Sequence, residues 1–332
     1  MLIVYANMKK IIVCFFAAFI FICCSTVSVQ QYHTVAFYTS KINLDVPVEN
    51  RIQLASDKVI SMLNTMDSTS EYQPYSPTAD EITLFSEYLE LLPEKYKQII
   101  KEKVVAVFFI ENFMGGGMTQ WVYDKKETMY MVWFFNPEIL HRTMAEWINY
   151  RENSYFSSDN SSGIAIAVEC SSDYFALLHT LVHETSHVYD YNYHITPFTE
   201  PFLQDEHSAL KTNFTDKIWN DYDRPAEEYD FLYRDSLSAY GLGPAQKKSL
   251  SIDIYRSLSK TPFASLYGSQ NWAEDFAESF TWFYLEKYLH CTYRIRISKN
   301  NEDVFIYEPL LNPLFTSRFD NFKAIMEPDS GQ

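Results

Sequence analysis

The chain has 332 residues, of which 47% are hydrophobic and 17% aromatic, and its formal net charge is −16. The length and apolar content are sufficient for a substantial hydrophobic core, and only 8 glycines and 13 prolines argue against a low-complexity or disordered chain. The acidic balance disfavours nucleic acid as a partner, because phosphates bind to basic surfaces.

The first residues have the pattern of an export signal. Lys9 and Lys10 precede the apolar residues 11–24, as the positive and hydrophobic regions of a secretory signal peptide do. This apolar run is shorter than the roughly 20 residues that cross a membrane as a helix. We therefore expect a signal peptide over 1–28 and a secreted or periplasmic mature domain over 29–332, with no stable membrane span after signal removal.

Three of the five cysteines, Cys14, Cys23 and Cys24, lie in this first segment. A lipid anchor on Cys23 or Cys24 is the disfavoured alternative, because residues 20–22 lack the small side chain that usually precedes a lipidated cysteine. The two remaining cysteines are too few for a disulfide-rich fold or a cysteine-type zinc finger.

The first part of the mature chain mixes helical and extended patterns. Residues 32–46 are predicted to be extended, and 49–66 carry apolar side chains at helical spacing. A second helix is predicted over 80–91, and Pro93 begins a third at its first turn. The β-branched and aromatic run 104–110 predicts a strand.

A predicted hairpin follows, with strands at 119–123 and 128–135. Gly115–Gly117 before it is interpreted as a turn, and close approach of the backbone to a ligand is the alternative. A helix over 137–150 and a polar loop lead to a buried strand at 164–168, which feeds directly into a helix over 173–191.

The last part is predicted to be mainly helical. Residues 204–258 show no strand pattern, and a long amphipathic helix follows over 265–290. A hairpin is predicted over 293–308 and a last helix over 318–326. Without repeats or a separating linker, this order predicts one α+β domain with a mixed sheet and a helical C-terminal part.

The densest chemistry lies in the helix over 173–191, which contains the H-E-x-x-H sequence His183-Glu184-Thr185-Ser186-His187. Residues four apart share one helix face, so both imidazoles can bind one Zn²⁺. Glu184 lies beside them and can act as general base on a water activated by the metal. The alternative is a surface helix that carries two histidines by chance.

A catalytic zinc site requires a third protein ligand. His194 is nearby, but the spacing and the missing glycine do not match a metzincin. Asp190 lies on the ligand face, and we expect it to support His187 rather than bind the metal. His179, one turn before His183, is expected to support the site or to pack.

Glu274 and Glu278 are better candidates, since they lie four residues apart on one face of the later helix. One carboxylate can bind the metal while the other accepts a hydrogen bond from a ligand histidine. Acidic residues early in a helix are also favoured by the helix dipole alone. The spacing leaves open which carboxylate does which.

At this point the sequence resembles the anthrax lethal factor-like zinc peptidases. Members have an H-E-x-x-H helix and then a tyrosine seven residues before an E-x-F-A-E-x-F stretch, which here are Tyr267 and Glu274–Phe280. The resemblance covers about residues 178–290. It implies a zincin-type fold with Glu274 as third ligand, Glu278 in support and Tyr267 as a donor to the developing oxyanion.

Together these observations predict an exported zinc endopeptidase of the gluzincin type that acts on peptides or proteins. Its substrate would extend along a sheet edge, supplied by 164–168 or by 130–135. Two other classes remain as alternatives. One is a zinc hydrolase of a non-peptide amide such as a cell-wall bond, and the other is a non-catalytic binding protein with this fold.

A disulfide between Cys170 and Cys291 is a further possibility. Cys170 precedes His183 by 13 residues, and Cys291 follows Glu274 by 17. If the two helices ran antiparallel, offsets of roughly 20 and 25 Å would bring both sulfurs to one end of the site. Two buried thiols are the alternative.

Overall fold

The computed structural model describes residues 31–158, 162–170, 173–197 and 211–327. The predicted signal peptide and the cysteines within it lie outside the described residues. The described chain is a mixture of helices and strands that includes a mixed sheet, which confirms the predicted α+β class.

The larger sheet has the strand order β1-β2-β4-β3. These strands are β1 (Gln73–Tyr75), β2 (Val104–Glu111), β3 (Gly117–Tyr123) and β4 (Met129–Phe135). The β2–β4 pair is parallel, whereas β1–β2 and the predicted hairpin β3–β4 are antiparallel. Within the described residues β3 is therefore an edge strand of this sheet, and β4 is paired on both sides.

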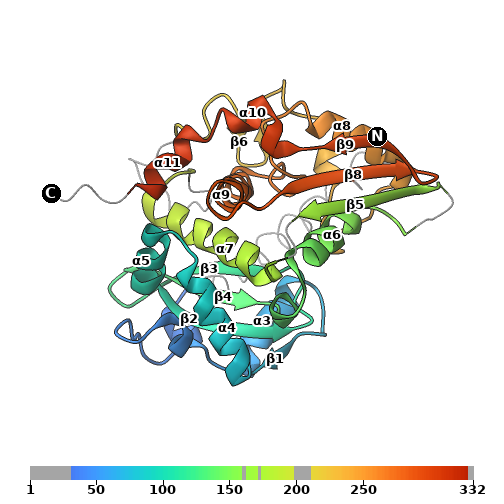
Figure 1. The fold of residues 1–332 in the computed structure, drawn as a ribbon. Coiled ribbons are helices and arrows are strands. Elements are labelled where there is room, and N and C mark those ends of the chain that lie inside the picture. The colour runs from blue at the N-terminus through green and yellow to red at the C-terminus, as the bar shows by residue number, and fades with distance from the viewer. Residues whose placement is uncertain (1–30, 159–161, 171–172, 198–210, 328–332) are drawn as a thin grey trace, which may run out of the picture.

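Helices cover both faces of the larger sheet (Figure 1). Alternate side chains of β2 and β4 point to opposite faces, so the sheet separates two hydrophobic clusters. One face packs against α2 (Val35–Tyr38) and α3 (Asp57–Met66). The other packs against α4 (Ala79–Glu90), α5 (Glu94–Lys103) and α7 (Ala176–Tyr193).

The smaller sheet has the order β5-β8-β9, and all of its pairs are antiparallel. Its strands are β5 (Ile164–Cys170), β8 (Tyr293–Lys299) and β9 (Glu302–Tyr307), so the predicted C-terminal hairpin is confirmed. Strand β5 is not fully buried as expected, because Ala165 and Ala167 are exposed between buried neighbours. Side-chain amides of Asn149 and Asn153 in α6 (Met144–Ser154) bond to its backbone.

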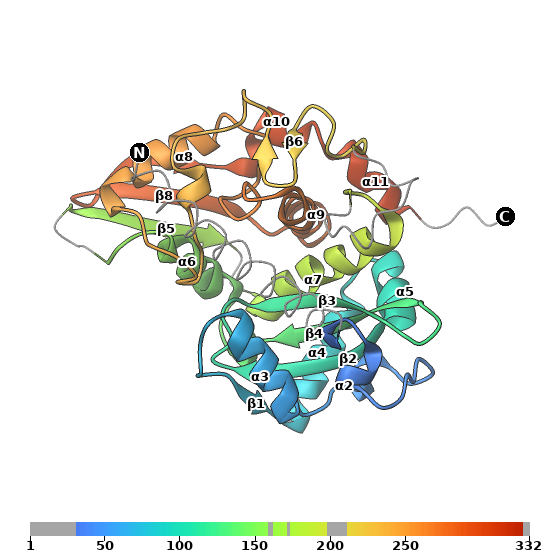
Figure 2. The same ribbon diagram turned by 180° about the vertical axis from the view of Figure 1, so that it is seen from behind.

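Helices α7 and α9 (Trp272–Leu289) cross between the two sheets, as the views from the front and from behind show (Figures 1 and 2). Most residues of both helices are buried, which suits apolar side chains around most of the helix surface. Their polar residues must therefore find partners inside the protein. This crossing is where the predicted site residues meet.

Three predicted segments are wrong. Residues 32–46 include the short helix α2 instead of being extended throughout, and only Asp57–Met66 of 49–66 is α-helical. The described residues 211–250 form turns and the small hairpin β6 (Trp219–Asp221) and β7 (Arg224–Pro225). Of the predicted helical segment 204–258, the described residues form an α-helix only at α8 (Ser251–Leu258). The remaining short elements are η1 (Val48–Arg51), η2 (Pro137–Leu140), η3 (Arg234–Ser236), η4 (Lys248–Leu250), η5 (Pro309–Leu311), α10 (Pro313–Thr316) and α11 (Asp320–Met326).

The predicted disulfide is not formed in the structure, where Cys170 and Cys291 are both thiols. They are nevertheless neighbours, because β5 and β8 pair Cys170 with Tyr293. Burial raises the pKa of Cys170 to about 12, and the adjacent Cys291 adds to this effect. Strand pairing, and not an antiparallel pair of helices, brings the two residues together.

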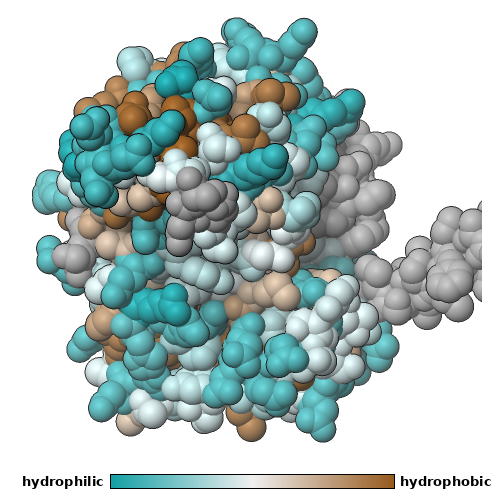
Figure 3. Space-filling model, turned by 90° about the vertical axis from the view of Figure 1, so that its right-hand side faces the viewer, coloured by the Kyte–Doolittle hydropathy of each residue, from teal (hydrophilic) through white to brown (hydrophobic). Residues whose placement is uncertain are grey.

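In the described part of the chain, none of the helices combines the length and the apolarity that crossing a bilayer would require. The face shown in Figure 3 is mostly hydrophilic, and its hydrophobic residues occur in small groups between polar ones.

Candidate metal centre

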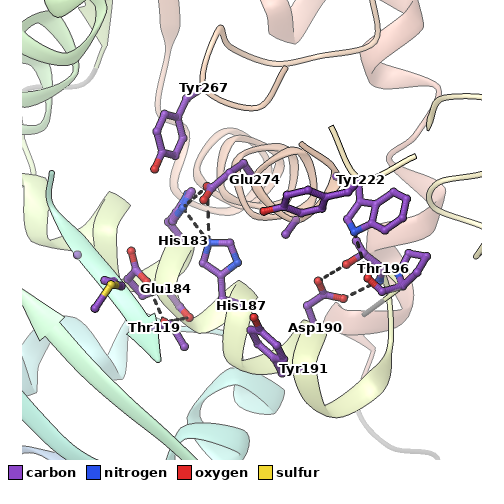
Figure 4. A pocket seen from close by; sticks show the side chains of 15 residues that line it. Thr119, His183, Glu184, His187, Asp190, Tyr191, Thr196, Tyr222, Tyr267 and Glu274 are labelled. Atoms are coloured by element: carbon purple, nitrogen blue, oxygen red, sulfur yellow. Dashed lines mark hydrogen bonds and ion pairs between the residues drawn. The ribbon is translucent and has the colours of Figure 1, made fainter. Parts of the chain in front are cut away.

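Helix α7 places His183 and His187 one turn apart on the face that looks toward α9 (Figure 4). Their Nε2 atoms are 3.2 Å apart. His183 is buried, and the His187 side chain is 13% exposed. Two imidazole nitrogens of this kind point at one small volume, as the four-residue spacing predicts.

Helix α9 adds Glu274 in its first turn. The side chain of Asn271 caps this helix by accepting the Glu274 backbone N–H at 2.9 Å, which fixes where the turn begins. Glu274 Oε2 then lies 3.1 Å from His183 Nε2 and 3.6 Å from His187 Nε2. No hydrogen-bond donor of suitable geometry reaches this buried oxygen from the described residues. The three side chains form a group that could hold a metal ion.

The charges of these side chains are strongly coupled. Burial alone would raise the pKa of Glu274, but His187 and His183 outweigh burial and hold it at about 2. Burial disfavours the His183 imidazolium, yet Glu274 and Glu278 raise its pKa to about 10. A metal cation at this point would displace the histidine proton and take over its electrostatic role.

Glu278 lies behind His183, one turn further along α9. Its Oε1 is 3.3 Å from His183 Nδ1, so it can orient the ring that presents Nε2 to the centre. Arg151 binds both carboxylate oxygens of Glu278, at 2.8 and 2.9 Å, and the Ser265 hydroxyl donates at 2.6 Å. Burial would raise the Glu278 pKa, but Arg151 and His183 outweigh it and lower the pKa well below its usual range.

His179 lies 3.4 Å from Glu278 and packs its ring against Trp282. Burial lowers its pKa to about 3, so it is a neutral packed residue beside the network. His194 ends α7 in the left-handed conformation and is not part of the metal-binding group.

Asp190 was predicted to support His187, and the nearby His187 favours its charged form. Its carboxylate accepts the backbone N–H and the hydroxyl of Thr196, both at 2.6 Å. Burial raises its pKa to about 6, although both Thr196 bonds favour the charged form. Asp190 therefore fixes the chain that leaves α7.

Glu184 points toward β3 and is held there by Thr119. The Thr119 hydroxyl lies 2.8 Å from Glu184 Oε2 and 3.0 Å from the Glu184 backbone oxygen. A Cβ on Gly117 would come within 2.9 Å of Glu184 Cγ, so only glycine permits this approach. Burial raises the Glu184 pKa, which favours a group that can accept a proton.

Tyr267 projects toward His183 and Glu274 from the opposite side (Figure 4). Its ring centroid is 5.9 Å from that of His183, and the Arg151 guanidinium lies 5.4 Å from its ring. Burial, reinforced by Glu274, raises the pKa of Tyr267 well above its usual range. Its hydroxyl therefore remains a hydrogen-bond donor at neutral pH.

The centre opens into a cavity of about 210 Å³. Strand β3 contributes Gly117, Met118 and Thr119 to its lining. Neither strand predicted as a substrate edge is suitable: 130–135 lies inside the larger sheet, and α6 covers the edge of 164–168. The edge strand beside the centre is β3.

Sequence reasoning missed Thr119, Arg151 and Tyr222. The last of these comes from the β6–β7 hairpin and lines the cavity. All three lie far in sequence from the metal-binding residues and are brought near them by the fold, so no local sequence pattern identifies them. The triple glycine was an available signal: Gly116 and Gly117 allow close approach to Thr180 and Glu184 of α7, whereas Gly115 adopts a positive φ of 89°.

Comparisons with protein-family models, with curated proteins and with solved structures found no match for this chain.

Proposed function

We propose that the chain is an exported zinc-dependent peptidase with His183, His187 and Glu274 as metal ligands. The distances among their ligand atoms carry this proposal. Zinc bonds of 2.0–2.1 Å at tetrahedral angles place ligand atoms roughly 3.3–3.4 Å apart. The three separations here are 3.1, 3.2 and 3.6 Å. Two imidazoles and one carboxylate are also a donor set that suits zinc.

Zinc bound here would supply Lewis acidity, lowering the pKa of water toward about 7 and polarising a carbonyl. Glu184 takes the proton of the attacking water, and its raised pKa matches that task. The Tyr267 hydroxyl donates a hydrogen bond to the oxyanion that develops on the scissile carbonyl. Glu278 keeps the His183 ring oriented throughout.

A peptide substrate fits the edge of β3 best. An extended chain can add to an exposed strand edge through backbone hydrogen bonds. Gly117 and Thr119 lie on that edge and also line the cavity with His183 and Glu184. The edge therefore presents a peptide bond to the base and the metal ligands together, which favours peptide over sugar substrates.

Hydrolysis of a mixture of fluorogenic peptides by the purified mature protein tests the proposal. We expect activity that a chelator abolishes and zinc restores. Glu184→Gln should retain zinc and lose activity, because an amide cannot accept the proton. The exposed Glu87 on α4 provides a matched control, and Glu87→Gln should be as active as the parent. Cleavage of peptidoglycan fragments but of no peptide would support the cell-wall alternative instead.

A further inference from the structure

The edge of β3 is only partly available. The Tyr123 backbone N–H donates to the His33 carbonyl oxygen at 2.8 Å, so the backbone N–H of Tyr123 points away from β4. The β3–β4 register runs without a shift from Gly117 to Tyr123, and successive residues alternate in direction. Gly117, Thr119, Trp121 and Tyr123 therefore all present their backbone groups to the outer edge.

The chain's own N-terminal segment occupies half of this edge. Thr34 forms a parallel bridge with Tyr123, beside the hydrogen bond to His33. The His33 ring stacks on Trp121 with centroids 3.4 Å apart, and its Nδ1 lies 3.2 Å from the Trp121 carbonyl oxygen. The outward carbonyl oxygen of Trp121 and the outward N–H of Tyr123 are thus already engaged.

The following helix anchors this segment. Val35, Phe37 and Tyr38 of α2 are buried against the larger sheet, and the Tyr38 hydroxyl donates to the Tyr32 carbonyl at 2.9 Å. Displacing His33 and Thr34 would therefore strain an element that packs in the core. We call His33 and Thr34 the cap.

The part of the β3 edge that the cap leaves open, Gly117 to Thr119, lies beside the metal centre. Thr119 bonds to Glu184, and both Gly117 and Thr119 line the cavity. Trp121, where the cap begins, is two residues further, or roughly 7 Å along an extended strand. In the other direction the cleft continues, since a second cavity shares Gly117 and Glu184 and extends to Tyr240.

We propose that the cap closes one end of the substrate cleft, so that a bound peptide extends no more than about two residues past the centre on that side. The inference rests on the proposed peptidase function. It assigns the substrate class as peptides with the scissile bond near one chain end, or short peptides. The cap is thus a determinant of specificity built from the chain's own N-terminal segment.

Two peptide series test this proposal with the full mature chain. One lengthens the peptide from one to six residues on the amino side of the scissile bond, and the other does so on the carboxyl side. We expect kcat/KM to fall roughly tenfold or more beyond two or three residues in one series only, as a loss of about 1.4 kcal/mol would produce. Equal tolerance of long peptides in both series would overturn the proposal.

Variants assign the limit to the cap. His33→Gly combined with Thr34→Gly removes the ring stack and loosens the segment, and should raise the ratio of long-peptide to short-peptide kcat/KM in the limited series. His33→Ala should do so less, because the backbone bond to Tyr123 remains. The matched control is His141→Ala, which removes a histidine bonded to Glu81 and should leave the length profile unchanged. An unaltered profile in folded, zinc-loaded double variants would contradict the proposal.

Binding of the same two series to zinc-loaded Glu184→Gln separates this inference from the proposed function. A length limit in binding, with no hydrolysis by the parent, would support the cap and contradict the peptidase. Hydrolysis by the parent without a length limit in either series would support the peptidase and contradict the cap. Failure to bind any peptide would contradict both.

Discussion

Glu274 and Glu278 occupy one face of α9 but meet His183 from different sides. Glu274 faces Nε2 of both histidines, whereas Glu278 faces Nδ1 of His183, does not approach His187, and is neutralised by Arg151. The sequence could place both carboxylates near the site but could not divide the tasks between them. The separate partners of the two carboxylates support the division that the resemblance implied.

This division predicts different effects on metal affinity. Glu278→Gln should weaken zinc binding by about 10–100-fold, as loss of a supporting carboxylate does. Glu274→Ala should weaken it further, because it removes one of three protein ligands. Titration against a chromophoric chelator measures both. If Glu278→Gln weakened zinc binding more than Glu274→Ala, Glu278 would be the metal ligand and Glu274 the supporting carboxylate.

Tyr267 should matter for turnover and not for metal binding. Tyr267→Phe keeps the partly buried ring beside Arg151 but removes the hydroxyl, so the fold and zinc content should persist while kcat falls by ~10²-fold. Steady-state kinetics with the best peptide measures this. If Tyr267→Phe had the same kcat as the parent, Tyr267 would contribute only to packing and not to turnover.

At the level of elements, the buried ion pair between α6 and α9 holds the centre in place. The Arg151 side chain is 2% exposed and that of Glu278 is fully buried. Arg151→Met would leave a buried carboxylate without its cation, so the free energy of unfolding should fall by about 3–5 kcal/mol. Denaturant unfolding of the chelator-treated protein provides the value.

The surface pair of Arg224 and Asp221 offers the matching control. Both side chains are largely exposed, so Arg224→Met should change the unfolding free energy little. In the double variant Arg151→Met with Glu278→Gln, the loss should be smaller than the sum of the single losses, since both single variants break the same ion pair, while the buried Glu152, which also pairs with Arg151, is unchanged. Additive losses would show that the pair is not coupled.

Elements with strong local signals could be predicted. Both hairpins, β3–β4 and β8–β9, and helices α4 and α5 follow from alternation, turn residues and Pro93. The β6–β7 region could not, because its few short strands are stabilised by packing, as when Trp219 donates to Asp275 of α9. The substrate edge could not be predicted from the sequence either. It depends on the parallel pairing of β2 with β4, which are far apart in the chain, because this pairing leaves β3 at the edge of the sheet.

At the scale of the whole molecule, pairing of β5 with β8 brings the two mature cysteines near each other without a bond. We expect two alkylatable thiols after denaturation without reductant. In the native protein the partly buried Cys170, with its raised pKa, should react slowly because little thiolate forms. Intact mass after alkylation tests this, and a protein that gains no label unless reduced would restore the disulfide predicted from the sequence.

Helices α7 and α9, which cross between the two sheets, bring together one small group of side chains, His183, His187 and Glu274. Zinc K-edge absorption of the purified mature protein, combined with metal content per chain, tests this convergence most directly. The account predicts close to one zinc per chain, with two nitrogen ligands and one carboxylate oxygen from the protein at about 2.0–2.2 Å. It also predicts loss of one oxygen ligand in Glu274→Ala. A protein that binds no stoichiometric zinc, or whose zinc environment is the same in Glu274→Ala, would contradict it.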